Sequence, residues 1–306
     1  MISDDLIQAI HKKRKVDTLA NAVSDKDGDI LILTSPSDIG VCRNGGRRGS
    51  CFAPNALMTV FLKCTLPADH LSSIPKLQIT PVSSMAQEKA SFGQGQIETR
   101  KNISHACKNF SGQTLLHLGG GHDHIFPFLS ALEENFSYKR LVVINIDAHL
   151  DTRTDNFAHS GTPFRQFAET TQRDFALYQV GIHPYSNGGA NYTPLPTGTM
   201  VLLPQQDPLS SLQEKVRLDA DDLYMLSLDC DALHASYMEA VSAVNHQGMD
   251  LTTLQSIFHW YKSITKKQTS LIGIYEYNPL YDNLSQKGAR AIAATLYQYI
   301  FSAPAK

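Results

Sequence analysis

The stretch LVVINIDAHLDTR, residues 141–153, joins an apolar run to three regularly spaced polar side chains. Asp147, His149 and Asp151 occupy every second position after the apolar residues. In an extended segment, side chains at positions i, i+2 and i+4 point to the same side. The pattern therefore predicts a buried strand whose carboxyl end directs three possible cation ligands into one space.

Similar apolar runs recur along the chain and predict further strands. They lie at 29–33, 114–119, 176–182, 200–203, 223–229 and 271–278. Most are continuously apolar, which is typical of strands covered on both faces in a parallel sheet. Amphipathic helices are expected at 251–265 and 285–301, and a loop at 183–199. We expect a three-layer α-β-α sandwich with a largely parallel sheet, in one domain spanning residues 1–306.

The composition narrows the class of protein. The 306 residues carry a net charge of −2 and include 18% charged residues, so we expect no nucleic-acid partner. No apolar run is long enough to cross a bilayer, so we expect no membrane span. Residues 1–17 lack the order of a secretory signal, because their charges follow a short apolar stretch. Five scattered cysteines fit a reduced, cytoplasmic protein better than a disulfide framework.

Polar side chains also follow three other predicted strands. His122 comes after strand 114–119, Asp229 and Asp231 come at the end of strand 223–229, and Glu276 lies near the end of strand 271–278. A single aspartate at a strand end is usually a helix N-cap, and a lone GGGH is usually a turn. Caps do not require this density of acids, and open α/β sheets bind ligands outside the carboxyl ends of their strands. The clusters therefore predict one site.

Several carboxylates in one crevice would repel each other unless a positive charge balances them. No lysine or arginine flanks Asp229 or Asp231 closely, so we expect metal ions. The candidate ligands are His122, Asp147, His149, Asp151, Asp229 and Asp231. Six ligands are too many for one tetrahedral ion and suit two ions about 3.5–4 Å apart. Oxygen-rich ligands favour Mn²⁺ or Mg²⁺, and the net negative site would favour an amidinium or guanidinium substrate.

Four motifs in this order resemble the ureohydrolase superfamily of arginases and agmatinases. They are GGGHD (119–123), DAHLD (147–151), SLDCD (227–231) and EYNP (276–279). Within that superfamily, SDIGVCRNGGRRGSCFAPNAL (37–57) and SGTPFRQ (160–166) look like the formimidoylglutamase branch. The resemblance covers nearly the whole chain. It implies an arginase-like fold, two Mn²⁺ per chain and a homo-oligomer such as a trimer or hexamer.

The resemblance also implies roles for the metal ligands. His122, Asp147, Asp151 and Asp229 would hold one ion. Asp147, His149, Asp229 and Asp231 would hold the other, so that Asp147 and Asp229 bridge the two. Glu276 would orient an amidinium, and Asp151 would pass a proton to the leaving nitrogen.

The implied reaction is hydrolysis of N-formimidoyl-L-glutamate to L-glutamate and formamide, a step of histidine degradation. The substrate contacts would be Asn44, Arg47, Arg153, Ser160, Gly161 and Glu276. Arg153 would face a substrate carboxylate, the alternative being a surface ion pair with Asp155. Arginases carry a proton-shuttling histidine where this chain has Phe164 or its neighbour, so we assign no histidine shuttle.

Three alternatives remain open. The protein could be an agmatinase, a guanidinobutyrase or another amidine hydrolase of the same superfamily, with an identical metal centre. A deacylase of related fold would hold one zinc. A metal-bound regulatory protein would show no turnover on any amidine.

Overall fold

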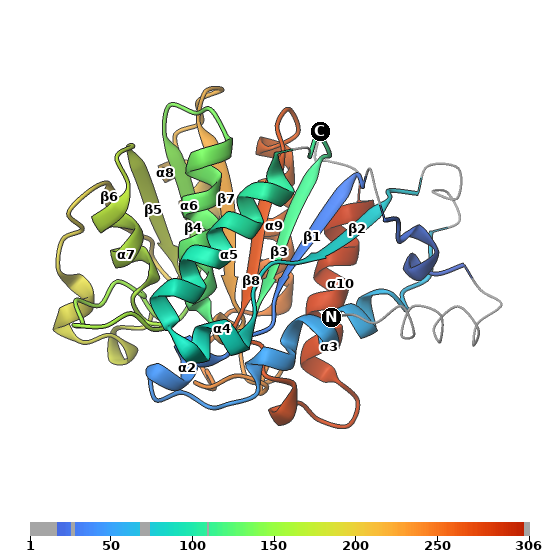
Figure 1. Cartoon of the computed structure of the whole chain (residues 1–306), viewed down its shortest axis with the longest axis horizontal. Coiled ribbons are helices and arrows are strands. Elements are labelled where there is room, and N and C mark those ends of the chain that lie inside the picture. The colour runs from blue at the N-terminus through green and yellow to red at the C-terminus, as the bar shows by residue number, and fades with distance from the viewer. Residues whose placement is uncertain (1–16, 26–27, 68–73, 109, 303–306) are drawn as a thin grey trace.

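The computed structural model describes residues 17–25, 28–67, 74–108 and 110–302 (Figure 1). Residues 1–16, on which the predicted absence of a secretory signal rests, lie outside the described residues. One parallel sheet runs through the described ranges. Its strands are β1 (Ile30–Ser35), β2 (Leu77–Pro81), β3 (Thr114–Gly119), β4 (Leu141–Ile146), β5 (Phe175–Val180), β6 (Thr199–Leu202), β7 (Leu223–Asp229) and β8 (Ser270–Tyr275).

The strand order is β2-β1-β3-β8-β7-β4-β5-β6. Seven of the strands were predicted, with ends that differ by up to three residues. The sequence interpretation missed β2, an edge strand that is only partly buried and ends in a proline. A central strand is recognised by an unbroken apolar run, which LQITP lacks.

Helices cover both faces of the sheet, as predicted for the three-layer sandwich (Figure 1). Their bounds are α2 (Ile39–Arg43), α3 (Ala53–Phe61), α4 (Met85–Ala90), α5 (Phe92–Cys107), α6 (Ile125–Asn135), α7 (Pro163–Thr170), α8 (Pro208–Lys215), α9 (Leu251–Ile264) and α10 (Lys287–Phe301). Helices α5, α6 and α7 pack on one face, and α3, α8, α9 and α10 on the other. The predicted loop at 183–199 holds two short 3₁₀ turns, Pro184–Ser186 and Gly189–Tyr192.

The central strand β4 shows why both faces are apolar. Val142 and Ile144 belong to the core on the α9–α10 side, whereas Leu141 and Val143 belong to the core on the α5–α6 side. All four side chains are fully buried. Successive side chains of a strand point to opposite faces, so a strand between two helical layers is apolar at most positions.

No helix in the described ranges is long and apolar enough to cross a membrane. The single domain over residues 1–306 stays a prediction.

Replacing Ile144 by alanine should destabilise the fold by about 2–5 kcal/mol, because the lost atoms leave a cavity between β4 and the helices behind it. Urea unfolding followed by circular dichroism would measure the change. Val201→Ala, at a half-buried position on the edge strand β6, is the matched control and should cost clearly less. Equal losses for the two variants would contradict this account of the core.

Candidate metal centre

Four neighbouring strands bring the candidate ligands together. In the order β3-β8-β7-β4, each strand is parallel to the next, so their carboxyl ends share one edge of the sheet. His122 follows β3 in the 3₁₀ turn η4 (His122–His124), and Glu276 follows β8. Asp229 ends β7, and Asp147 follows β4 directly. The fold therefore positions the site, because the strand order sets which polar residues meet.

Residues 147–151 form a loop rather than the predicted strand extension. Strand β4 ends at Ile146, and the backbone N–H of His149 donates to Asp147 Oδ1 at 2.7 Å. This local bond turns the chain in the way that an aspartate commonly does after a strand. Asp151 has a φ of 51°, in the left-handed region. The alternating side chains do converge, but by a turn and not by extended geometry.

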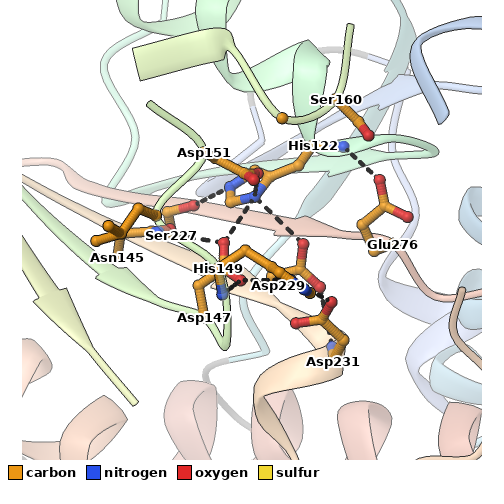
Figure 2. A network of polar contacts seen from close by, with 12 residues as sticks. His122, Asn145, Asp147, His149, Asp151, Ser160, Ser227, Asp229, Asp231 and Glu276 are labelled. Carbon is orange, nitrogen blue, oxygen red and sulfur yellow. Dashed lines mark hydrogen bonds and ion pairs between the residues drawn. The ribbon is translucent and has the colours of Figure 1, made fainter. Parts of the chain in front are cut away.

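His122 lies at the centre of three carboxylates (Figure 2). Its Nδ1 is 3.1 Å from Asp147 Oδ2, 2.9 Å from Asp151 Oδ2 and 3.3 Å from Asp229 Oδ2. All of these groups are buried. One nitrogen cannot satisfy three carboxylates, so the arrangement needs a positive charge that all four groups can share.

The other ring nitrogen of His122 has its own partner. Nε2 is 2.9 Å from Ser227 Oγ, on strand β7. A metal-binding histidine commonly donates this second N–H to a neighbouring acceptor, which leaves the first nitrogen with a free lone pair. Nδ1 is buried without a well-directed hydrogen bond. The donors therefore fit a metal ion bound by His122 Nδ1 and the three aspartates.

A second group shares Asp147 with the first. His149 Nδ1 is 3.0 Å from Asp231 Oδ2 and 3.6 Å from Asp147 Oδ1. Asp147, His149 and Asp231 each offer an atom within 4.8 Å of the others. Asp229, which the resemblance assigns to both ions, is in the first group only, and its Oδ1 accepts from the Asp231 N–H at 2.9 Å. The two groups suit a binuclear centre in which Asp147 bridges.

The protonation of the acids reflects their crowding. Burial raises the pKa of Asp229 well above its usual range, and the charges of Asp231 and Asp147 add to the shift. Burial also raises the pKa of Asp151 to about 6, again helped by Asp147. These carboxylates favour protons when no other cation is present. Metal binding must displace those protons, so metal affinity should fall as the pH falls.

Glu276 contacts the backbone of His122, whereas the three aspartates contact its ring. Its Oε1 accepts from the backbone N–H of His122 at 3.0 Å (Figure 2). Its φ is 63°, and its side chain is buried in the wall of the cavity above the acids. Burial raises the pKa of Glu276 to about 8, opposed by that hydrogen bond and supported by the charges of Asp231 and Asp123. A cationic group in the cavity would stabilise its ionised form.

A cavity of about 300 Å³ opens above the acids. Five predicted substrate contacts line it: Asn44, Arg153, Ser160, Gly161 and Glu276. Arg47, the sixth, is not among the lining residues. Its guanidinium lies 4.9 Å from the centre of the Tyr281 ring, so the structure gives it a separate stacking partner.

Arg153 is held at the wall of this cavity by several groups. Its Nη2 contacts Asn44 Oδ1 and lies 3.1 Å from His159 Nδ1, and its Nε is 3.3 Å from Asp155 Oδ2. A Cβ on Gly161 would lie 2.7 Å from Nη2, so glycine leaves room for the guanidinium. Arg153 therefore forms the ion pair with Asp155 and also lines the cavity.

The sequence interpretation missed several residues of the site. Ser242 and Ala243 line the cavity, and their segment was noticed only as a short match to the family. Asn145 donates to Asp147 Oδ2 at 3.3 Å and to Gln179 Oε1 at 2.9 Å, which helps to fix the carboxylate of Asp147. Two buried amides at paired positions of β4 and β5 were the available signal, because such groups are rare in apolar strands.

Comparison with known proteins agrees with this geometry. The family model described as the arginase family matches residues 28–302. The chain belongs to the arginase family. The predicted family and arginase-like fold are therefore confirmed.

Formimidoylglutamases are among the similar proteins. That of Enterobacter sp. (strain 638) is 31% identical over 304 residues, covering 96% of this chain and 93% of the relative. The Trypanosoma cruzi formiminoglutamase structure with Mn²⁺ has a TM-score of 0.72 and 22% identity, and covers 94% of this chain and 98% of that one. The Bacillus subtilis formimidoylglutamase structure has a TM-score of 0.75 and 18% identity, with 94% and 92% coverage.

The shared position of Asp147 predicts different losses of metal for two variants. Asp147→Asn should remove most bound Mn²⁺ from both groups, because each loses its common carboxylate. Asp231→Asn should weaken the second group only. Elemental analysis of protein dialysed against Mn²⁺ would count the ions per chain. Equal metal content in the two variants would argue against a bridging role for Asp147.

Proposed function

We propose that this protein is a formimidoylglutamase, which hydrolyses N-formimidoyl-L-glutamate to L-glutamate and formamide with two Mn²⁺ per chain. The observation that carries the proposal is the charge layout of one cavity. Acids gather at its floor, and Arg153 lies in its wall. A substrate with an amidinium at one end and carboxylates at the other matches this layout.

The metal ligands proposed are His122, Asp147, His149, Asp151, Asp229 and Asp231. Their oxygen and imidazole donors are those that Mn²⁺ accepts. Two such ions, when bound, would supply Lewis acidity and lower the pKa of water, so that hydroxide is available at neutral pH. The names of the similar proteins, and the Mn²⁺ of the Trypanosoma cruzi formiminoglutamase structure, support this assignment.

Two carboxylates of the chain act on the reacting group. Glu276 faces the cavity, where its carboxylate would accept hydrogen bonds from the amidinium and hold the formimidoyl carbon over the acids. Water adds to that carbon, and the bond from carbon to the glutamate nitrogen breaks. Asp151 would take the proton of the attacking water and deliver it to the leaving nitrogen. The Asp151 carboxylate would then accept the remaining hydroxyl proton as the formamide carbonyl forms, and the leaving group is the neutral amine of glutamate.

The other end of the substrate would meet a polar wall. Arg153 presents a planar guanidinium that can bind a carboxylate through two parallel hydrogen bonds. Asn44 donates to Ser160 Oγ at 3.0 Å, so the two side chains and Gly161 form one continuous edge beside Arg153. Arg47 would contribute only by leaving its stacking position on Tyr281.

The setting of the reaction follows from the same proposal. We assign the protein to the cytoplasm and to histidine degradation, and we expect a homo-oligomer such as a trimer or hexamer. Cys42, Cys51, Cys107 and Cys230 carry free thiols, which suits a reducing compartment.

A substrate panel tests the proposal. Mn²⁺-loaded protein should release formamide from N-formimidoyl-L-glutamate. It should turn over agmatine, guanidinobutyrate and arginine at least about 100-fold less efficiently, because agmatine lacks a carboxylate and all three carry a guanidinium in place of the formimidoyl group. Product analysis by mass spectrometry separates formamide from urea. Urea from agmatine as the main product would replace the proposal by agmatinase. One zinc per chain would favour a deacylase.

Arg153→Ala should raise KM for N-formimidoyl-L-glutamate by about 10-fold or more, with a smaller change in kcat, because the residue binds the part of the substrate that does not react. Asp155→Asn is the control, since it removes the ion-pair partner and keeps the guanidinium. Steady-state kinetics with metal-saturated protein would measure both. An unchanged KM for Arg153→Ala would exclude it from the substrate site.

A further inference from the structure

A second buried cluster of acids and imidazole lies beside the metal centre. Glu88 on α4 and Asp123 and His124 in η4 are each at most 2% exposed. One ligand atom from each lies within 4.8 Å of the other two. None of these residues belongs to the six proposed ligands, and the family motifs gave them no role.

Most carboxylate oxygens of this cluster lack a hydrogen-bond donor among the described residues. Both oxygens of Asp123 and Oε1 of Glu88 are buried with no hydrogen-bond partner among the described residues. The other oxygen of Glu88 accepts from Ser37 Oγ. His124 lies near both acids through different ring nitrogens: its Nδ1 is 3.8 Å from Glu88 Oε1, and its Nε2 is 4.0 Å from Asp123 Oδ2. Buried carboxylate oxygens require donors or a cation, and among the described residues these three have no donor and only the more distant His124 ring as a cationic partner.

The ring of His124 is oriented as a ligand. Its Nε2 donates to the carbonyl oxygen of Ser37 at 3.3 Å, because a carbonyl can only accept. Nδ1 is then turned toward Glu88 Oε1 at 3.8 Å. This gap is too long for a hydrogen bond. It is within the span of two atoms on one ion, about 4 Å for metal–ligand bonds of about 2.0–2.2 Å.

We propose that Glu88, Asp123 and His124 bind a third divalent cation, of the class of Mn²⁺ or Zn²⁺, separate from the binuclear centre. Two carboxylates and a neutral imidazole balance a double positive charge. Mixed oxygen and nitrogen donors suit these ions better than Ca²⁺. The ion joins α4 to the turn η4, which begins with His122. Its role is to fix the turn that presents a ligand of the neighbouring centre.

Glu88→Gln tests the site by counting metal. The variant keeps the size of the side chain and a group able to contact Ser37, but removes its charge. After equilibrium dialysis of chelator-treated protein against Mn²⁺, wild type should hold one more ion per chain than Glu88→Gln. Glu169→Gln, at an exposed position, is the control and should match wild type. Equal numbers of bound Mn²⁺ ions in wild type and Glu88→Gln would overturn the proposal. Protons, rather than a metal ion, would then neutralise the carboxylates of the cluster.

Anomalous scattering at the manganese edge gives a second readout that needs no variant. Crystals soaked in MnCl₂ should show a peak between Glu88, Asp123 and His124, apart from those at the six proposed ligands. No peak there beside an occupied binuclear centre would also overturn the proposal. The result is independent of the reaction, since neither measurement uses turnover of any substrate.

Discussion

Electrostatic repulsion among buried carboxylates is the constraint on which this molecule depends. Asp147, Asp151 and Asp229 stand within 3.3 Å of one imidazole nitrogen, in a space that water barely reaches. Four adjacent parallel strands end at that point, so the sheet itself forces the acids together. Such an arrangement is stable only with compensating positive charge, which protons supply poorly and divalent ions supply well. The sheet is therefore built around charges that it cannot neutralise alone.

The surrounding groups keep each acid in a fixed orientation. Backbone N–H groups of His149 and Asp231 bind Asp147 and Asp229, and Ser227 holds the far side of the His122 ring. Behind them, Gln179 anchors Asn145 and also donates to the carbonyl oxygen of Leu150 at 2.7 Å. Outer contacts of this kind orient ligands before an ion arrives, which reduces the entropy lost on binding.

Features that are encoded in a short stretch of sequence could be predicted. Features that depend on residues far apart in the chain could not. Apolar runs predicted seven strands, since burial on both faces leaves few polar positions. The six candidate ligands were visible because they lie at or shortly after the ends of predicted strands. The edge strand β2 carries no such signature. Glu88 lies in a polar helix far before Asp123 in the chain, so nothing in its neighbourhood indicates that the fold buries it. The turn at Asp147–Asp151 also depends on a side-chain hydrogen bond, which periodicity does not report.

The left-handed backbone at Asp151 and Glu276 has a consequence for how this protein can change. Each conformation costs about 1–3 kcal/mol for a residue with a side chain, and glycine would adopt it freely. Mutational drift toward glycine at these two positions would relieve strain and raise thermal resistance, but it would also remove two carboxylates that line the cavity. Under the proposed function, selection for thermal stability and selection for turnover therefore act in opposite directions at these positions, and a screen for heat-tolerant descendants would tend to recover inactive ones.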